Sequence, residues 1–241
     1  MRGTLSALRT FTSPFEGGQH RPQAKWLRDM LTGMLRAGSV KLTEIGRALD
    51  EEARDGGPRK LIHTVKRLSR NLNSDRFDDA ALLAAWWPQV EHYTMRKDGK
   101  GVVAGVDYSD VEAPYARPDR PRGLQAACVC RDGSKGIQAM GIAIAQIDAV
   151  LPDGGRIPIR YEPFKHGVKN ASQNRVFTDL LAEVAPHVGD LAWFAFDRGF
   201  DGPRYFDAAD RVGVQWAIRL KIDPKVARHL IMADGAVVRA N

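Results

Sequence analysis

The order of apolar segments in the second part of the chain constrains its fold more than any other feature. Segments typical of strands come first, at residues 102–107, 124–130 and 137–149, and residues 157–161 extend this set. Helical and strand segments then alternate: helix 171–184, strand 191–196, a helix from residue 203, and strand 214–220. Consecutive strands followed by alternating helices and strands predict a mixed sheet with helices packed on it, an α/β fold.

The first part of the chain predicts a separate, all-helical domain. Apolar residues recur at helical spacing in residues 23–37, 39–53, 58–71 and 78–87. Gly38 is expected to end the first of these helices and Pro88 the last. A polar, glycine-containing turn follows near residue 96, before the first strand. We therefore expect a helical domain at residues 1–95 and a sheet domain at residues 96–241.

Positive charge is concentrated in the helical domain. The chain has a formal net charge of +7, and residues 1–100 hold 18 Lys and Arg against 12 Asp and Glu. Residues 101–241 hold 18 against 17. A concentrated positive excess suits phosphate binding, because each contact releases condensed counterions. Nucleic acid is the partner that this charge favours, and a basic surface that only keeps the protein soluble is the alternative.

The segment 58–71 is the best candidate for DNA contact. Apolar residues at helical spacing are expected to face inward: Leu61, Ile62, Val65 and Leu68. The opposite side carries His63 and the expected DNA-contacting residues Arg59, Lys60, Lys66, Arg67 and Arg70. Short helices joined by tight turns, the last one basic, suggest a helix-turn-helix-like arrangement. A solvated helix face without a nucleic-acid role is the alternative.

Two aspartates, Asp107 and Asp197, close apolar strand segments. An acid is expensive to bury in such a place unless it is paired or binds a cation. Two acids on neighbouring strands repel each other, and divalent metal relieves the conflict. Two ions about 3.5–4 Å apart also support phosphoryl transfer. Oxygen ligands favour Mg²⁺ or Mn²⁺ over zinc. The alternative is that each aspartate only caps the turn after it.

The residues around both acids resemble a known family. The sequence VAGVDYSD at residues 103–110 resembles the first-aspartate strand of DDE transposases of bacterial insertion sequences, of the insertion-sequence-4 type. FAFDRGFDG at residues 194–202 is similar to their second-aspartate motif, and KRLSRNL at residues 66–72 to their amino-terminal region. The resemblance spans residues from about 5 to 221.

The resemblance implies an RNase H-like catalytic core and a function in DNA transposition. It implies that Asp107 and Asp197 are catalytic residues that bind Mg²⁺ or Mn²⁺ for DNA cleavage and strand transfer. Arg198 is expected to contact DNA or to brace the carboxylates. The implied partners are double-stranded DNA, at transposon ends and target, and a second copy of the chain in the DNA complex.

The resemblance also implies a third acid, a Glu on a later helix. The last Glu of this chain is Glu183, which precedes Asp197. We therefore expect a carboxy-terminally truncated transposase that binds metal weakly and catalyses little or no strand transfer alone. Two alternatives stay open. One is a truncated DNA-binding protein that occupies transposon ends and inhibits transposition. The other is an RNase H-like nuclease with Asp110 as its third ligand.

Membrane and secretory roles are not expected. The longest wholly apolar run has eight residues, 80–87, whereas a membrane-spanning helix needs about 20. No apolar run follows the arginine near the start, so a secretory signal is not expected. Cys128 and Cys130, two residues apart on an expected strand, are poorly placed to form a disulfide. A cytoplasmic location is the expectation.

Overall fold

The computed structural model describes residues 2–52, 61–72, 74–95, 101–112, 126–128, 139–165, 173–219, 228–231 and 237–240. The chain divides into two compact units, Met1–Gln89 and Val90–Asn241. The boundary between the units lies inside one helix. None of the helices in the described segments is long and apolar enough to cross a membrane.

Unit 1 is helical. Its helices are α1 (Arg2–Glu16), α2 (Arg21–Ala37), α3 (Leu42–Glu52), α4 (Leu61–Leu72) and the first part of α5 (Asp79–Thr94). Gly38 ends α2 in the left-handed conformation, with φ of 58°, which glycine adopts without strain. Three of the expected helices, α2 to α4, are present close to their expected bounds. Helix α1 had no counterpart in the sequence pattern.

Helix α5 continues past Pro88, so the expectation that it ends there is wrong. Proline costs an interior helix one hydrogen bond and introduces a clash. The residues after it are held by packing in unit 2. Val90 is fully buried, and Thr94 Oγ1 donates to the carbonyl oxygen of His187 at 2.8 Å. These long-range contacts offset the local cost of the proline.

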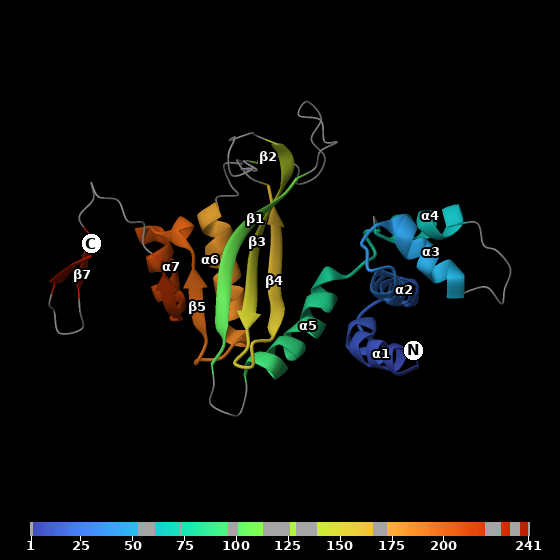
Figure 1. Ribbon diagram of the computed structural model, residues 1–241, viewed down its shortest axis with the longest axis horizontal. Helices are drawn as coiled ribbons and strands as arrows, with labels where there is room; N and C mark the ends of the chain where they lie inside the picture. Colours follow the sequence, from blue (N-terminus) through green and yellow to red (C-terminus); the bar gives the residue numbers. More distant parts are fainter. Residues whose placement is uncertain are drawn as a thin grey trace. The chain divides into compact units, whose positions relative to one another are not determined.

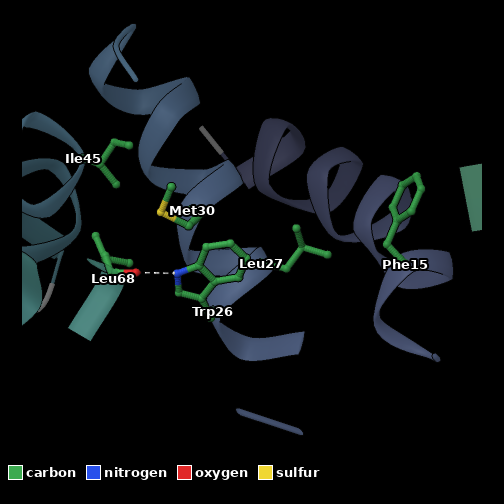
Figure 2. Close-up of a cluster of buried hydrophobic side chains, with 6 residues drawn as sticks. All are labelled: Phe15, Trp26, Leu27, Met30, Ile45 and Leu68. Atoms are coloured by element: carbon green, nitrogen blue, oxygen red, sulfur yellow. Dashed lines mark hydrogen bonds between the residues drawn. The ribbon is translucent and has the colours of Figure 1, made fainter. Parts of the chain in front are cut away.

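The core of unit 1 joins four helices (Figure 2). Its buried side chains are Phe15 from α1, Trp26, Leu27 and Met30 from α2, Ile45 from α3 and Leu68 from α4. Trp26 Nε1 donates to the carbonyl oxygen of Leu68 at 3.1 Å. The expectation that Ile62 faces inward is wrong, because its side chain is 52% exposed. Thr64 is buried in α4 and donates to Asp50 of α3.

Unit 2 is built on a mixed sheet. Its strands are β1 (Val103–Glu112), β2 (Ala126–Cys128), β3 (Ala139–Val150), β4 (Arg156–Phe164), β5 (Trp193–Phe196) and β6 (Gln215–Ile218). Its helices are α6 (Gln173–Val184), α7 (Pro203–Val212) and the short 3-10 turns η2 (Ala185–His187) and η3 (Arg198–Phe200). Strands β7 (Arg228–Ile231) and β8 (Val237–Ala240) form a separate two-stranded sheet. The expected mixed α/β class is confirmed.

The sheet has the order β2-β3-β1-β5-β6, with β4 also paired to β3. Strand β3 runs antiparallel to β1, β2 and β4, whereas β5 runs parallel to β1 and β6 parallel to β5. Figure 1 shows β1, β3 and β4 side by side, with β5 on the other side of β1. Val106 of β1 pairs with Phe196 of β5. The parallel pair therefore brings the residues after Val106 and Phe196 to the same part of the sheet.

The two faces of this sheet differ. Side chains alternate between faces along each strand. Ala104, Val106, Phe194 and Phe196 are at most 4% exposed, and we call their side the covered face. Phe177 of α6 packs against Phe196 there, with ring centroids 5.4 Å apart. The intervening residues point to the opposite side, which we call the open face. It includes Val103 and Trp193, which are 46% and 49% exposed.

Candidate functional site

The structure brings Asp107 and Asp197 together on the open face. The pairing of β1 with β5 ends at Val106 and Phe196, and each acid is the next residue on its strand line. Neighbouring strands are about 4.8 Å apart, so the two carboxylates emerge side by side. Both residues are exposed. A cost of burying these acids therefore does not arise, contrary to the expectation from the apolar strand segments. Asp107 also lies within β1 and not at its end, because β1 continues to Glu112.

Backbone amides orient both carboxylates. The amide of Tyr108 donates to Asp107 Oδ1 at 2.8 Å, and the amide of Gly199 donates to Asp197 Oδ1 at 2.6 Å. Asp197 is the N-cap of η3, so it caps the turn that follows it, as the alternative to metal binding stated. A Cβ at Gly199 would lie 2.7 Å from Asp197 Oδ1, which explains glycine at this position. Capping uses one carboxylate oxygen and does not prevent the other from binding a ligand.

A third acid, Asp148 of β3, lies beside them. It pairs with Gly105 across the antiparallel ladder and therefore faces the same side of the sheet as Asp107. The pairing of β3 with β4 shifts register between Ile147 and Asp148, a β-bulge that re-aims nearby side chains. Tyr161 donates its hydroxyl hydrogen to Asp148 Oδ1 at 2.7 Å.

Sequence reasoning missed Asp148. Its signal was the one that singled out the other two acids: a lone acid near the end of an apolar strand. Asp110, the alternative third ligand, lies three residues after Asp107 in β1 and so points to the opposite face. Asp110 also does not line the pocket around the other acids. The geometry does not favour Asp110 as a ligand.

A pocket of about 690 Å³ opens between these acids. Its lining consists of Gly105, Val106, Asp107, Asp148, Ala149, Val150, Arg156, Ile157, Pro158, Ala195, Phe196 and Asp197. The small residues Gly105 and Ala195 leave room between the strands. Arg156 is the basic residue of this lining, and it places one positive charge among three acids.

The acids influence one another electrostatically. Partial loss of hydration raises the pKa of Asp107, and the hydrogen bond from Tyr108 opposes this effect. The negative charges of Asp197 and then Asp148 raise the pKa of Asp107 further. The carboxylates are therefore close enough to repel each other, and a cation between them would relieve that repulsion.

The acids fit a divalent cation only in part. Asp107 and Asp197 offer carboxylate oxygens, the ligand type that Mg²⁺ and Mn²⁺ prefer. Within the described segments, however, no three His, Cys, Asp or Glu side chains are grouped closely enough to hold one ion. Asp148 thus lies near the pair without completing a compact set of three ligands. The donor set supports a weak site made by the pair.

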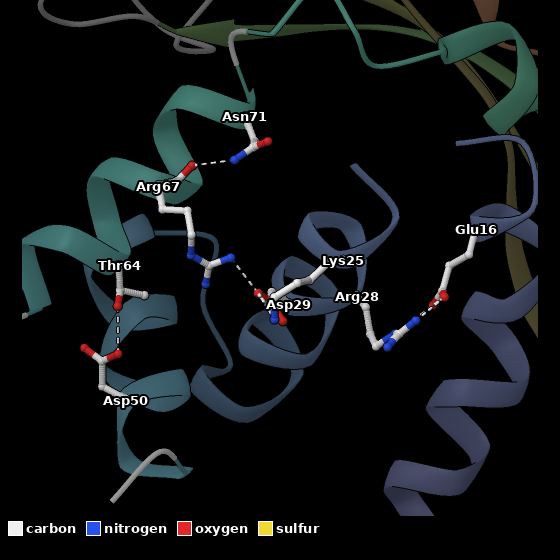
Figure 3. A network of polar contacts seen from close by, with 8 residues as sticks. All are labelled: Glu16, Lys25, Arg28, Asp29, Asp50, Thr64, Arg67 and Asn71. Carbon is white, nitrogen blue, oxygen red and sulfur yellow. Dashed lines mark hydrogen bonds and ion pairs between the residues drawn. The ribbon is translucent and has the colours of Figure 1, made fainter. Parts of the chain in front are cut away.

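The expected DNA-contacting residues fall into different environments, and Figure 3 shows that of Arg67. Lys66 and Arg70 are exposed on α4, as is Arg198 in η3, directly after Asp197. Arg67 instead donates to Asp29 Oδ2 of α2 at 2.6 Å, and its carbonyl oxygen accepts from Asn71. This ion pair helps to hold α4 on α2 and competes with DNA contact by Arg67. Arg59 and Lys60 lie outside the described residues.

No model of a known protein family matches the chain, and no curated protein is significantly similar to it in sequence.

Proposed function

We propose that this chain is a DDE-type transposase of a bacterial insertion sequence, with an RNase H-like catalytic core in unit 2 and a DNA-binding domain in unit 1. The observation that carries the proposal is the placement of Asp107 and Asp197 on adjacent parallel strands, on the open face of the sheet. The order of elements supports it. Antiparallel strands come first, and α6, β5, α7 and β6 then alternate. The family resemblance around both acids, set out from the sequence, points the same way.

The resemblance to DDE transposases implies the chemistry of the proposed reaction. Water attacks the phosphorus of a phosphodiester at the transposon end, so the 3′-oxygen of the transposon strand leaves as a hydroxyl group and the phosphate stays on the flanking strand. That hydroxyl attacks a phosphodiester of target DNA, forms a new bond to phosphorus and displaces the 3′-oxygen of the target strand. Mg²⁺ or Mn²⁺, when bound, would activate the attacking oxygen and stabilise the leaving oxygen.

The chain's own residues supply ligands, orientation and charge. Asp107 and Asp197 would hold the cation, and the amides of Tyr108 and Gly199 orient one oxygen of each carboxylate. The exposure of the open face gives a DNA strand access to both acids. Three carboxylates repel the phosphates of DNA. Arg156 and Arg198 would offset this repulsion by contacting the phosphates on either side of the bond that is cleaved. Positioning and charge stabilisation are the main sources of rate enhancement in this kind of transfer.

Unit 1 would bind the transposon end through α4. Lys66 and Arg70 lie one turn apart and are exposed together with His63. Unlike Arg67, they are not held by an acid of α2 in the described structure. Phosphate contacts of this kind position a protein on duplex DNA without reading its sequence. We propose that two copies of the chain act together in the DNA complex.

Binding is tested with short duplexes that cover the DNA on both sides of the coding region. Removing Lys66 in a Lys66→Ala variant is expected to reduce the dependence of log K on log salt by about 0.9, the value for one phosphate contact. Lys25→Ala, on exposed Lys25 of α2, is the matched control and should leave the slope unchanged. Equal slopes of log K against log salt for both variants would exclude α4 as the DNA-binding surface.

Catalysis is tested on the same duplexes with Mn²⁺. With two acids as its ligands, the chain is expected to cleave slowly, so long incubations are needed. Asp107→Asn and Asp197→Asn should abolish cleavage, whereas Asp110→Asn, on the opposite face, should not. Cleavage that survives both Asp107→Asn and Asp197→Asn would exclude the proposed active site.

A second candidate is a DNA-binding protein that occupies transposon ends and inhibits transposition. The observation that favours it is that the described acids do not form a group of three metal ligands. Sequence-specific binding to one duplex of the set, with no cleavage by the wild-type chain in Mn²⁺, would select this function. Absence of both binding and cleavage would overturn both proposals.

A further inference from the structure

We propose that Tyr108 and Phe200 form a ring pair that sets the distance between the Asp107 and Asp197 carboxylates. They act as positioning residues, because neither ring lines the pocket between the acids. This inference rests on the proposed function of the two acids. It assigns a role to side chains on the covered face, directly beneath the candidate site.

The need for such a pair follows from where the backbone pairing ends. The ladder between β1 and β5 stops at Val106 and Phe196, one residue before the acids. Strand β1 continues, whereas the chain after Phe196 turns into η3. The regular spacing of the sheet therefore does not by itself fix Asp197 relative to Asp107. Another contact has to join the two segments at this level.

The ring pair makes that contact. The rings of Tyr108 and Phe200 stack with centroids 5.0 Å apart and an angle of 17° between their planes. Tyr108 also supplies the amide that donates to Asp107 Oδ1. Phe200 lies in η3, whose Gly199 amide donates to Asp197 Oδ1, and the Phe200 amide itself donates to the Asp197 carbonyl oxygen at 3.2 Å. The stacked rings thus join the two peptide segments that orient the carboxylates.

The surrounding structure holds both rings in place. Phe200 is 2% exposed, and its ring contacts those of Phe177 and Tyr205 at 5.4 and 5.1 Å. The Tyr108 ring meets Phe164 edge-on at 5.9 Å. Its hydroxyl donates to the carbonyl oxygen of Gln173, at the start of α6, at 2.7 Å.

A small displacement of either acid matters for function. Misplacement of a reacting group by about 1 Å can reduce a rate about a hundredfold. Loss of a residue that orients a metal ligand weakens metal binding by about 10- to 100-fold. Replacing either ring with a flexible side chain of similar size should therefore weaken the site while the fold is kept.

The experiment measures Mn²⁺ binding to the full 241-residue chain by electron paramagnetic resonance. The signal of free Mn²⁺ gives a dissociation constant without requiring catalysis. Methionine substitutions conserve volume and are tolerated in cores. Tyr108→Met and Phe200→Met are expected to raise the Mn²⁺ dissociation constant about tenfold. The double variant should bind no more weakly than either single variant, because the rings act as one unit.

Two further variants make the role of the ring specific. Tyr108→Phe keeps the stacked ring and loses only the hydroxyl, so it should bind Mn²⁺ like the wild type. Phe206→Met removes a ring from another stacked pair of unit 2, Phe206 with Trp216, whose centroids are 5.4 Å apart and planes 14° apart. That pair joins α7 to β6 and includes neither of the peptide segments that orient the carboxylates, so its loss should leave Mn²⁺ binding unchanged.

The outcomes separate this inference from the proposed function. If Asp107→Asn and Asp197→Asn weaken Mn²⁺ binding but Tyr108→Met and Phe200→Met do not, the ring pair has no positioning role. The same conclusion follows if Phe206→Met weakens binding as much as they do. If neither Asp107→Asn nor Asp197→Asn weakens binding, the proposed metal site itself fails.

Discussion

The covered and open faces of the sheet in unit 2 are built from alternate residues of the same strands, yet their physical properties are opposite. Phe194 is 1% exposed, whereas Trp193 beside it is 49% exposed. Asp107, Asp148 and Asp197 all lie on the open face. A strand that is apolar throughout its sequence can therefore stabilise the fold with one face and present charged groups with the other.

The largest difference between the faces should appear in stability. Phe194→Ala removes a fully buried ring and is expected to reduce the free energy of unfolding by about 3–5 kcal/mol. Trp193→Ala removes a larger ring that is half in water and should cost about 1 kcal/mol or less. Urea unfolding monitored by circular dichroism measures both. Equal losses would mean that the open face is covered in solution.

Alanine substitutions at two glycines are expected to change the free energy of unfolding by a smaller amount. A Cβ at Gly141, which is buried in β3, would lie 2.5 Å from the carbonyl oxygen of Val111. Gly141→Ala should therefore push β1 and β3 apart and cost about 1–3 kcal/mol. A Cβ at Gly105, on the open face, would have its nearest neighbour, the Asp148 carbonyl oxygen, at 3.8 Å. Gly105→Ala should be neutral or stabilise by up to about 1 kcal/mol. Thermal unfolding of both variants measures the contrast, and the reverse order would contradict it.

The contrast between faces also shows what the sequence predicts well. Apolar segments and their spacing predicted the order of strands and helices and the mixed sheet, because these depend on local periodicity. They did not show that Asp107 is exposed within a longer strand. Exposure depends on which face of the sheet a neighbouring helix covers, and that is a long-range property. A short apolar run is consistent with a strand buried on both faces or on one.

The missed residue has a similar explanation. Asp148 lies two residues before the end of a long apolar strand, so it carried the signal of a lone acid near a strand end but did not close its segment as Asp107 and Asp197 do. Only the pairing with Gly105 places it beside Asp107. The continuation of α5 past Pro88 was also missed for a long-range reason, the packing of Val90 and Thr94 in unit 2. Local rules were overridden where residues far apart in the chain make contact.

Each face has a tyrosine hydroxyl that donates one hydrogen bond, and the stability lost on removing each bond compares the two faces. Tyr108 on the covered face donates to Gln173, and Tyr161, which is 48% exposed, donates to Asp148. Tyr108→Phe leaves a carbonyl oxygen without its partner at a half-buried place and should cost about 1–2 kcal/mol. Tyr161→Phe should cost about 0.5–1 kcal/mol, because water replaces the lost donor.

The pKa of Tyr161 reflects its hydrogen bond to Asp148 on the open face. Burial and the Asp148 carboxylate raise the pKa of Tyr161 to about 12. Urea unfolding at neutral pH compares the two Phe variants. A larger loss for Tyr161→Phe than for Tyr108→Phe would show that the open-face hydrogen bond is shielded from water.

The smallest expected effect is a gain in stability from the open face. The pKa of Asp107 is raised in the folded protein, by loss of hydration and by the charges of Asp197 and Asp148. A raised folded-state pKa means that the stability associated with protonated Asp107 is fully present below its unfolded-state pKa. That stability is lost as pH rises through the folded-state value.

Asp107→Asn keeps an acceptor for the Tyr108 amide and carries no charge. In EDTA, the variant should therefore match the wild type in acid and become more stable than it as pH approaches neutrality. Urea midpoints across this range measure the difference. A variant that is less stable than the wild type at neutral pH would show that Asp107 has a stabilising partner, and that the acids of the open face do not repel one another.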